Sequence, residues 1–179
     1  MRPTIIGIGG AYSGIGKTTL ASLILQRLKG WGAIKYTKTS LYCSVVYDIE
    51  TLSEQGKDTK IFLDSGAEKV LWVQSAYDNL LESLKMAVER LSYLKGIIIE
   101  GNSAIEALKP DVVIFIAGSE PERFKTSAQK ILEMSDIVIL DKEPIFAIPE
   151  KAKIFYRDNI EECIEYTLDF IKKSQEFNL

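Results

Sequence analysis

The chain has 179 residues, of which 46% are hydrophobic and 26% charged, and its formal net charge is −3. This composition is typical of a soluble globular protein, and the length leads us to expect a single domain over residues 1–179. The mildly acidic balance gives no basic footprint for nucleic acid, and every apolar run is too short to cross a membrane. We therefore expect neither a nucleic-acid partner nor a membrane partner.

Cysteine and histidine usage indicates the compartment. Cys43 and Cys163 are the two cysteines, they lie far apart in the sequence, and there is no histidine. This usage fits a reducing, cytoplasmic location. It also argues against a soft transition-metal site, because paired cysteines and histidines are the usual ligands there.

Apolar runs alternate with amphipathic segments from one end of the chain to the other. Strands are predicted, in chain order, at 5–8, 33–36 and 70–73, then in "KGIIIEGNS" (95–103), "PDVVIFIAG" (110–118) and "SDIVILDKEP" (135–144), and last in "AKIFYRD" (152–158). Helices are predicted at 17–28, 57–65, 79–94, 122–133 and 160–177, while 39–55 has no clear period and is predicted to be a long loop. Three of the strands are apolar throughout, which indicates a parallel sheet covered on both faces. The predicted fold is α/β, a three-layer P-loop NTPase fold with a mostly parallel central sheet of about seven strands.

The stretch "GAYSGIGKTT" at 10–19 joins the first strand to the first helix. It matches G-x-x-x-x-G-K-[ST] with alanine in the first position, the pattern of a loop whose backbone N–H groups surround nucleotide phosphates. Lys17 is predicted to reach the β- and γ-phosphates, and the Thr18 hydroxyl is predicted to hold Mg²⁺. The predicted nucleotide contacts in this loop are Gly14, Ile15, Gly16, Lys17, Thr18 and Thr19.

Two carboxylates are candidates for the metal and for catalysis beside Lys17. Glu100 ends the strand "GIIIEG", where a magnesium–triphosphate site usually has an acid. Asp58 in "GKDTKIF" begins a short predicted helix, where it is equally well explained as an acid favoured by the helix dipole. We predict a Mg²⁺ site made by Thr18, Asp58 and Glu100.

Recognition of the base is the least defined part of the predicted site. Guanine-specific P-loop proteins often carry N-K-x-D after a late strand, and "DKEP" at 141–144 agrees with it only at Lys142. We predict that Lys142 contacts the base, although a plain turn at the strand end explains it equally well. The residues leave GTP and ATP both open.

Several motifs together resemble the MobB family, which is associated with molybdopterin-guanine dinucleotide biosynthesis. They are "AYSGIGKTTL", "GAIKYTKTS", "GKDTKIFLDSGAEKVLWVQS" and "IIIEG", in that order over 5–101. The resemblance implies GTP and Mg²⁺ binding, weak hydrolysis, a homodimer, and molybdopterin or its guanylylating enzyme as partner. Lys35 and Lys38 match the basic end of the family's second strand, but the family's histidines there are absent.

Two other functions fit the same residues. An ATP-dependent small-molecule kinase or ligase would need an acceptor pocket, which 39–55 is long enough to help build. A nucleotide-dependent switch would instead reorder this segment and Asp58 to control a partner protein.

Overall fold

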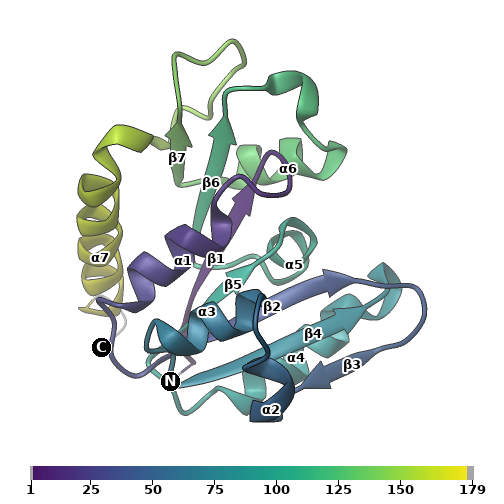
Figure 1. Cartoon of the computed structure of the whole chain (residues 1–179). Coiled ribbons are helices and arrows are strands. Elements are labelled where there is room, and N and C mark those ends of the chain that lie inside the picture. The colour runs from purple at the N-terminus through teal and green to yellow at the C-terminus, as the bar shows by residue number, and fades with distance from the viewer. Residues whose placement is uncertain (1, 177–179) are drawn as a thin grey trace.

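The computed structural model describes residues 2–176 and is built around one eight-stranded sheet (Figure 1). The strand order is β3-β4-β2-β5-β1-β6-β7-β8, and every neighbouring pair is parallel except β3 and β4. The strands are β1 Thr4–Gly10, β2 Trp31–Lys38, β3 Ser44–Val46, β4 Lys69–Ser75, β5 Gly96–Glu100, β6 Val112–Gly118, β7 Ile137–Leu140 and β8 Lys153–Tyr156.

Helices cover both faces of this sheet, which confirms the predicted three-layer α/β fold (Figure 1). Among them, α1 and α3 pack on one face, while α4, α5 and α6 pack together on the other. The α-helices are α1 Lys17–Leu25, α2 Ile49–Leu52, α3 Asp58–Asp64, α4 Leu80–Arg90, α5 Asn102–Leu108, α6 Thr126–Met134 and α7 Ile160–Glu176. Short 3₁₀ turns are η1 Tyr77–Asn79, η2 Pro121–Arg123 and η3 Arg157–Asn159.

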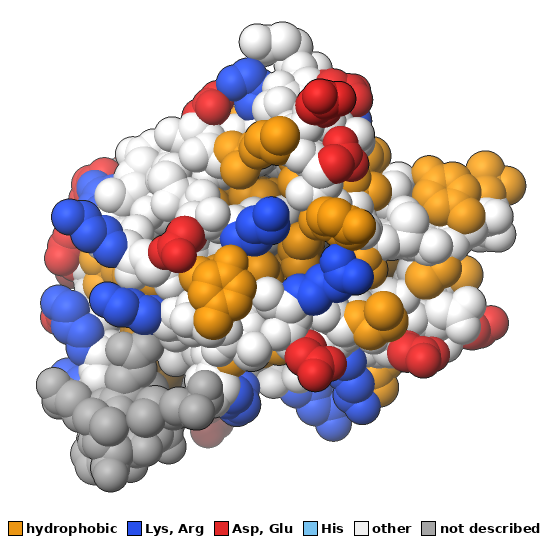
Figure 2. Space-filling view, turned by 90° about the horizontal axis from the view of Figure 1, so that it is seen from below, with side chains coloured by type: hydrophobic (Ala, Val, Ile, Leu, Met, Phe, Trp, Pro, Cys, Tyr) orange, Lys and Arg blue, Asp and Glu red, His pale blue; other side chains and the backbone are white. Residues whose placement is uncertain are grey.

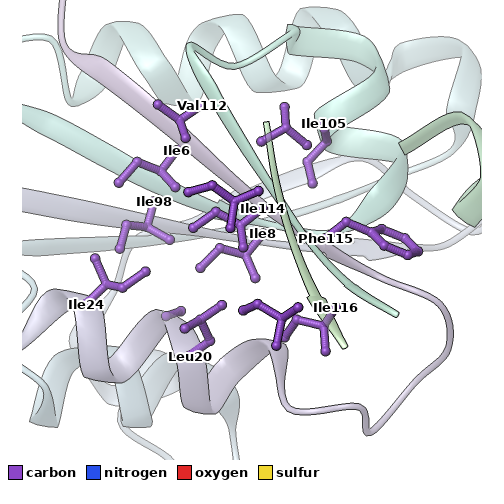
Figure 3. Close-up of a cluster of buried hydrophobic side chains, with 14 of the residues drawn as sticks. Ile6, Ile8, Leu20, Ile24, Ile98, Ile105, Val112, Ile114, Phe115 and Ile116 are labelled. Atoms are coloured by element: carbon purple, nitrogen blue, oxygen red, sulfur yellow. The ribbon is translucent and has the colours of Figure 1, made fainter. Parts of the chain in front are cut away.

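The central strands are apolar because they are buried on both sides. Ile6 and Ile8 of β1, Ile98 of β5 and Ile114 of β6 lie against Leu20 and Ile24 of α1 (Figure 3). A second cluster, which includes Ile97 and Ile99, lies against α4. This packing fixes β1 between β5 and β6, so the loop after β1 opens where the strand order changes direction, the usual ligand crevice of an open α/β sheet.

Three sequence-based predictions of secondary structure need correction. Residues 39–55 are not one loop, since they contain the edge strand β3 and the short helix α2. The helix predicted at 122–133 begins only at Thr126, after the 3₁₀ turn, and α5 was not predicted at all. The sheet accordingly has eight strands, because β3 adds an antiparallel edge strand through its pairing with β4.

The surface carries charges of both signs. In the face seen from below, Lys and Arg side chains are interspersed with Asp, Glu and apolar side chains (Figure 2). Within residues 2–176, no helix is long and apolar enough to cross a membrane.

Candidate nucleotide site

The loop between β1 and α1 has the backbone that its glycines predict. Gly14 has a φ of 79° and Gly16 a φ of 104°, values that side-chain-bearing residues rarely adopt. Gly16 is also the N-cap of α1, so the loop runs directly into the positive end of a helix. Ile15 between them is buried in the core. The loop is therefore anchored by the apolar side chains of Ala11 and Ile15, while Gly14 and Gly16 line the cavity beside it.

Side chains from three distant segments hold this loop in place. The amide of Asn102 at the start of α5 accepts from the Gly10 N–H at 3.0 Å and donates to the Gly10 carbonyl at 2.9 Å. Lys125 donates through its backbone N–H to the Ala11 carbonyl at 3.0 Å and through Nζ to the Ser13 hydroxyl at 2.9 Å. These contacts fix the loop before any ligand binds.

Arg157, just after β8, is the third of these contacts. Its Nη1 donates to the Ile15 carbonyl at 3.2 Å, and its Nε donates to Asp141 at 2.5 Å. The sequence offered no signal for this role, because Arg157 and Ile15 are 142 residues apart.

Lys17 and Thr18 both border the cavity beside the loop. The Lys17 ammonium donates to the Tyr12 carbonyl at 3.1 Å and borders the cavity. Burial lowers the pKa of Lys17; Glu100 offsets this in part, and the ammonium groups of Lys35 and Lys125 lower it further. Clustered ammonium groups of this kind create a positive potential that would attract a polyphosphate.

Glu100 contacts Thr18 directly, and Lys35 links Glu100 to Asp58. Glu100 is only 3% exposed, and its Oε2 accepts from the Thr18 hydroxyl at 2.8 Å. Its Oε1 accepts from Lys35 Nζ at 2.6 Å, and Asp58 Oδ2 lies 2.5 Å from the same nitrogen. Burial alone would lower the pKa of Lys35, but the two carboxylates outweigh burial and raise it.

These oxygens fit Mg²⁺. A hydroxyl and two carboxylates are hard donors of the type that Mg²⁺ prefers, and they come from α1, α3 and β5. Among residues 2–176, no three His, Cys, Asp or Glu side chains gather into a metal-binding group. Phosphate oxygens and water would complete the coordination, which is how Mg²⁺ is usually held beside nucleotides.

The cavity around this group has a volume of about 930 Å³ and is large enough for a nucleotide. It is bordered by the β1–α1 loop with Thr18 and Thr19, the ends of β2 and β5, the start of α3, and the starts of α5 and α6. Lys142 does not border it, being exposed after β7, so the structure does not bring this predicted base contact to the other site residues.

A smaller cavity of about 210 Å³ adjoins the first and shares Lys35, Thr37 and Asp58 with it. Its wall includes Trp72, whose indole N–H donates to the Thr37 hydroxyl at 3.0 Å, and Lys57, which lies 4.8 Å from the centre of the Trp72 ring. Half-buried Trp72 packs against the hydrophobic core and also forms part of the wall of this cavity. Trp31, by contrast, is 3% exposed and lies within the core.

No protein-family model matches the chain, and no curated protein matches it in sequence. Solved structures do match. HypB from Helicobacter pylori, solved in complex with nickel, aligns at a TM-score of 0.62 with 11% identity over 97% of this chain and 89% of that one. A plasmid partition protein from Borrelia burgdorferi aligns at 0.50 with 16% identity over 94% and 99% of the two chains. This chain therefore shares the fold of these two proteins.

These identities show the fold and no particular family. MobB from Bacillus subtilis aligns at a TM-score of 0.46 with 16% identity over 92% of this chain and 95% of that one. The predicted P-loop fold is thus confirmed, while the resemblance to MobB rests on the sequence motifs.

Proposed function

We propose that this protein binds a nucleoside triphosphate together with Mg²⁺, GTP being the first candidate and ATP the second, and hydrolyses it slowly. One observation carries the proposal. The glycine loop opens onto a large cavity at the point where Lys17 faces it and Thr18 is hydrogen-bonded to the buried Glu100. A strand-to-helix turn with a purely structural role would need none of these three polar groups.

Each predicted residue has a role in this proposal. The backbone of Gly14, Ile15 and Gly16, with the first turn of α1 at Thr18 and Thr19, binds the phosphates. Lys17 stabilises charge on the β- and γ-phosphates. Thr18, Glu100 and Asp58 hold Mg²⁺, which when bound neutralises the charge that develops on the phosphate oxygens.

Hydrolysis is expected to be slow. P-loop catalysis is mostly positioning and electrostatic stabilisation, and it reaches high rates when an arginine is supplied to the transferring phosphate. Arg157 is held by Asp141 and by the Ile15 carbonyl, on the loop backbone. In the proposed function, Arg157 therefore supports the loop, and a faster rate needs a cation from a partner.

The first experiment is thermal unfolding with GTP, GDP, ATP or ADP in the presence of Mg²⁺. At about a hundred times its dissociation constant a ligand adds roughly 2.7 kcal/mol, which raises Tm by about 5–10 °C for a chain of this size. Lys17→Ala should abolish the shift. No shift with any nucleotide in the wild-type protein would overturn the proposal.

Lys142→Ala is the matched lysine variant, and it also tests the predicted base contact. An unchanged shift with an unchanged order of the four nucleotides assigns Lys142 to a surface turn. A reduced preference between guanine and adenine nucleotides assigns it to the base.

The motif resemblance supports a role for this activity in cofactor biosynthesis. If guanine nucleotides are preferred, we propose a MobB-like accessory role in a cytoplasmic homodimer, with molybdopterin or its guanylylating enzyme as partner. Gly56 to Thr59, which belong to one of those motifs, support this because they lead into α3 and bring Asp58 to the cavity. Light scattering tests whether the protein is a dimer, and equilibrium binding of molybdopterin tests the partner. A monomer that does not bind molybdopterin would refute the proposed MobB-like role.

A second candidate function is phosphoryl transfer to a small molecule, supported by the 210 Å³ cavity that adjoins the nucleotide cavity through Lys35 and Asp58. An acceptor bound there would lie next to the proposed γ-phosphate position. The two functions differ in stoichiometry: transfer consumes nucleotide in proportion to added acceptor, whereas hydrolysis continues at the same rate without one.

A further inference from the structure

Lys35 occupies an unusual place at the floor of the nucleotide cavity. Its ammonium lies 2.5 Å from Asp58 Oδ2 and 2.6 Å from Glu100 Oε1, between the two carboxylates proposed to hold Mg²⁺. The side chains of Lys35, Asp58 and Glu100 are 18%, 39% and 3% exposed. One amino group is thus shared by an almost fully buried acid and a half-exposed one.

The fold explains why these three groups meet. Lys35 and Glu100 are register partners on the neighbouring parallel strands β2 and β5, so their side chains point to the same face of the sheet. Asp58 is the first residue of α3, which packs over that face. A buried carboxylate without a counter-charge is strongly unfavourable, so Glu100 needs a cation when no metal is present.

The lysine and a divalent cation compete for the same oxygens. Glu100 Oε2 already accepts from Thr18, and Oε1 accepts from Lys35, so both oxygens of this carboxylate are engaged. Mg²⁺ held directly by a carboxylate lies about 2.0–2.1 Å from its oxygen. An ammonium on the same oxygen would then face the divalent charge at close range, where the repulsion is large.

We propose that Lys35 is a tethered counter-ion: it neutralises Asp58 and Glu100 in the nucleotide-free protein and turns away from them when Mg²⁺ arrives with the nucleotide. This inference rests on the proposed function. Lys35 then makes metal binding depend on nucleotide, because free divalent cations meet carboxylates that are already paired. The 210 Å³ cavity, which Lys35 also lines, gives the side chain room to turn without disturbing the core.

The test measures Mn²⁺ binding without nucleotide, from the electron paramagnetic resonance signal of free Mn²⁺. Lys35→Met should bind Mn²⁺ at least about tenfold more tightly than the wild-type protein, because removing one unit charge beside a divalent cation exceeds a factor of ten even at high effective dielectric. Lys38→Met is the matched control: Lys38 is exposed at the end of the same strand and borders the same cavity, so it should behave like wild type.

Two further variants keep the test decisive. Lys35→Gln also removes the charge but retains a hydrogen-bond donor, so it should gain Mn²⁺ affinity even if Lys35→Met folds poorly. Lys35→Arg keeps the charge and should bind Mn²⁺ as weakly as wild type. Equal Mn²⁺ affinity in wild type and in the folded neutral variants would overturn the proposal. Because this titration contains no nucleotide, a failure of the proposed function shows separately, as the lack of any nucleotide-dependent thermal shift in the wild-type protein.

Discussion

Asn102 offers the sharpest test of how the phosphate loop is held. Its side-chain amide closes two hydrogen bonds with one residue, one to the Gly10 N–H and one to the Gly10 carbonyl. Asn102→Ala removes both and leaves two backbone groups of a buried residue without these partners. Each such loss costs about 1–3 kcal/mol, and we take the low end because Gly10 borders the cavity, where water can reach it.

The expected result is a loss of about 2 kcal/mol in the free energy of unfolding, or a fall in Tm of roughly 4–8 °C. Urea unfolding measures the first quantity, and the m-value should stay unchanged because the folded surface is the same. Ser103→Ala, one residue further at the same helix start, is the control and should stay within about 0.5 kcal/mol of wild type.

Asn102→Asp should give a pH dependence of stability that general destabilisation would not produce. Its carboxylate still accepts from the Gly10 N–H but faces the Gly10 carbonyl, so we expect the folded-state pKa of this aspartate to be raised. The variant should then lose stability at pH 7 and recover part of it as the pH falls toward the aspartate range. The reasoning is refuted if Asn102→Ala unfolds within about 0.5 kcal/mol of wild type.

Three other perturbations have defined outcomes. Burial lowers the folded-state pKa of Lys17 below its usual 10.5, so protonated Lys17 costs stability at pH 7. This cost decreases as the pH rises from the folded-state pKa and is gone once the pH exceeds the unfolded-state pKa near 10.5. Lys17→Met should therefore raise the Tm of the nucleotide-free protein at pH 7, and an equal or lower Tm would contradict this. Arg157→Met should weaken nucleotide binding by about tenfold, because it removes the donor to the Ile15 carbonyl. It should change the free energy of unfolding by less than about 1 kcal/mol, because the ion pair with Asp141 is partly exposed. Equal nucleotide affinity of Arg157→Met and wild type in a calorimetric titration would contradict this prediction. Burial raises the pKa of the Cys163 thiol to about 12, so a thiol reagent at pH 8 should label Cys43 alone in the folded protein and both cysteines in denaturant. Folding stability should also decline as the pH rises above about 9, where only the unfolded thiol ionises. Fast labelling of two thiols in the folded protein would contradict this prediction.

The sequence predicts those parts of the fold that depend on local pattern. The apolar runs of β5, β6 and β7 identify buried parallel strands, and the glycines before Lys17 identify the phosphate loop. The three-residue strand β3 carries no periodic signal, because its residues are all half-buried and its pairing with β4 is set by tertiary structure. Helix α5 was missed because seven residues contain too few turns for a helical period to show.

The site divides in the same way. Lys17, Thr18, Glu100 and Asp58 are found from motifs, since each lies at a fixed place relative to a strand or helix end. The pairing of Lys35 with Glu100 depends on the register of two strands whose residues are 65 positions apart, which one sequence does not contain. The contact of Arg157 with the phosphate loop depends on the strand order in the same way. Asn102 had one local clue, since it directly follows Glu100 and Gly101 at the end of β5.

The most direct test of the central claim is a calorimetric titration of a non-hydrolysable GTP analogue, and separately of an ATP analogue, into the wild-type protein with Mg²⁺ and then with a chelator. We predict one binding site per chain for at least one analogue, with affinity that falls by about tenfold or more when the metal is removed and is lost in Lys17→Ala. No binding of either analogue, or binding that Lys17→Ala leaves unchanged, would contradict the assignment of this loop as a nucleotide site.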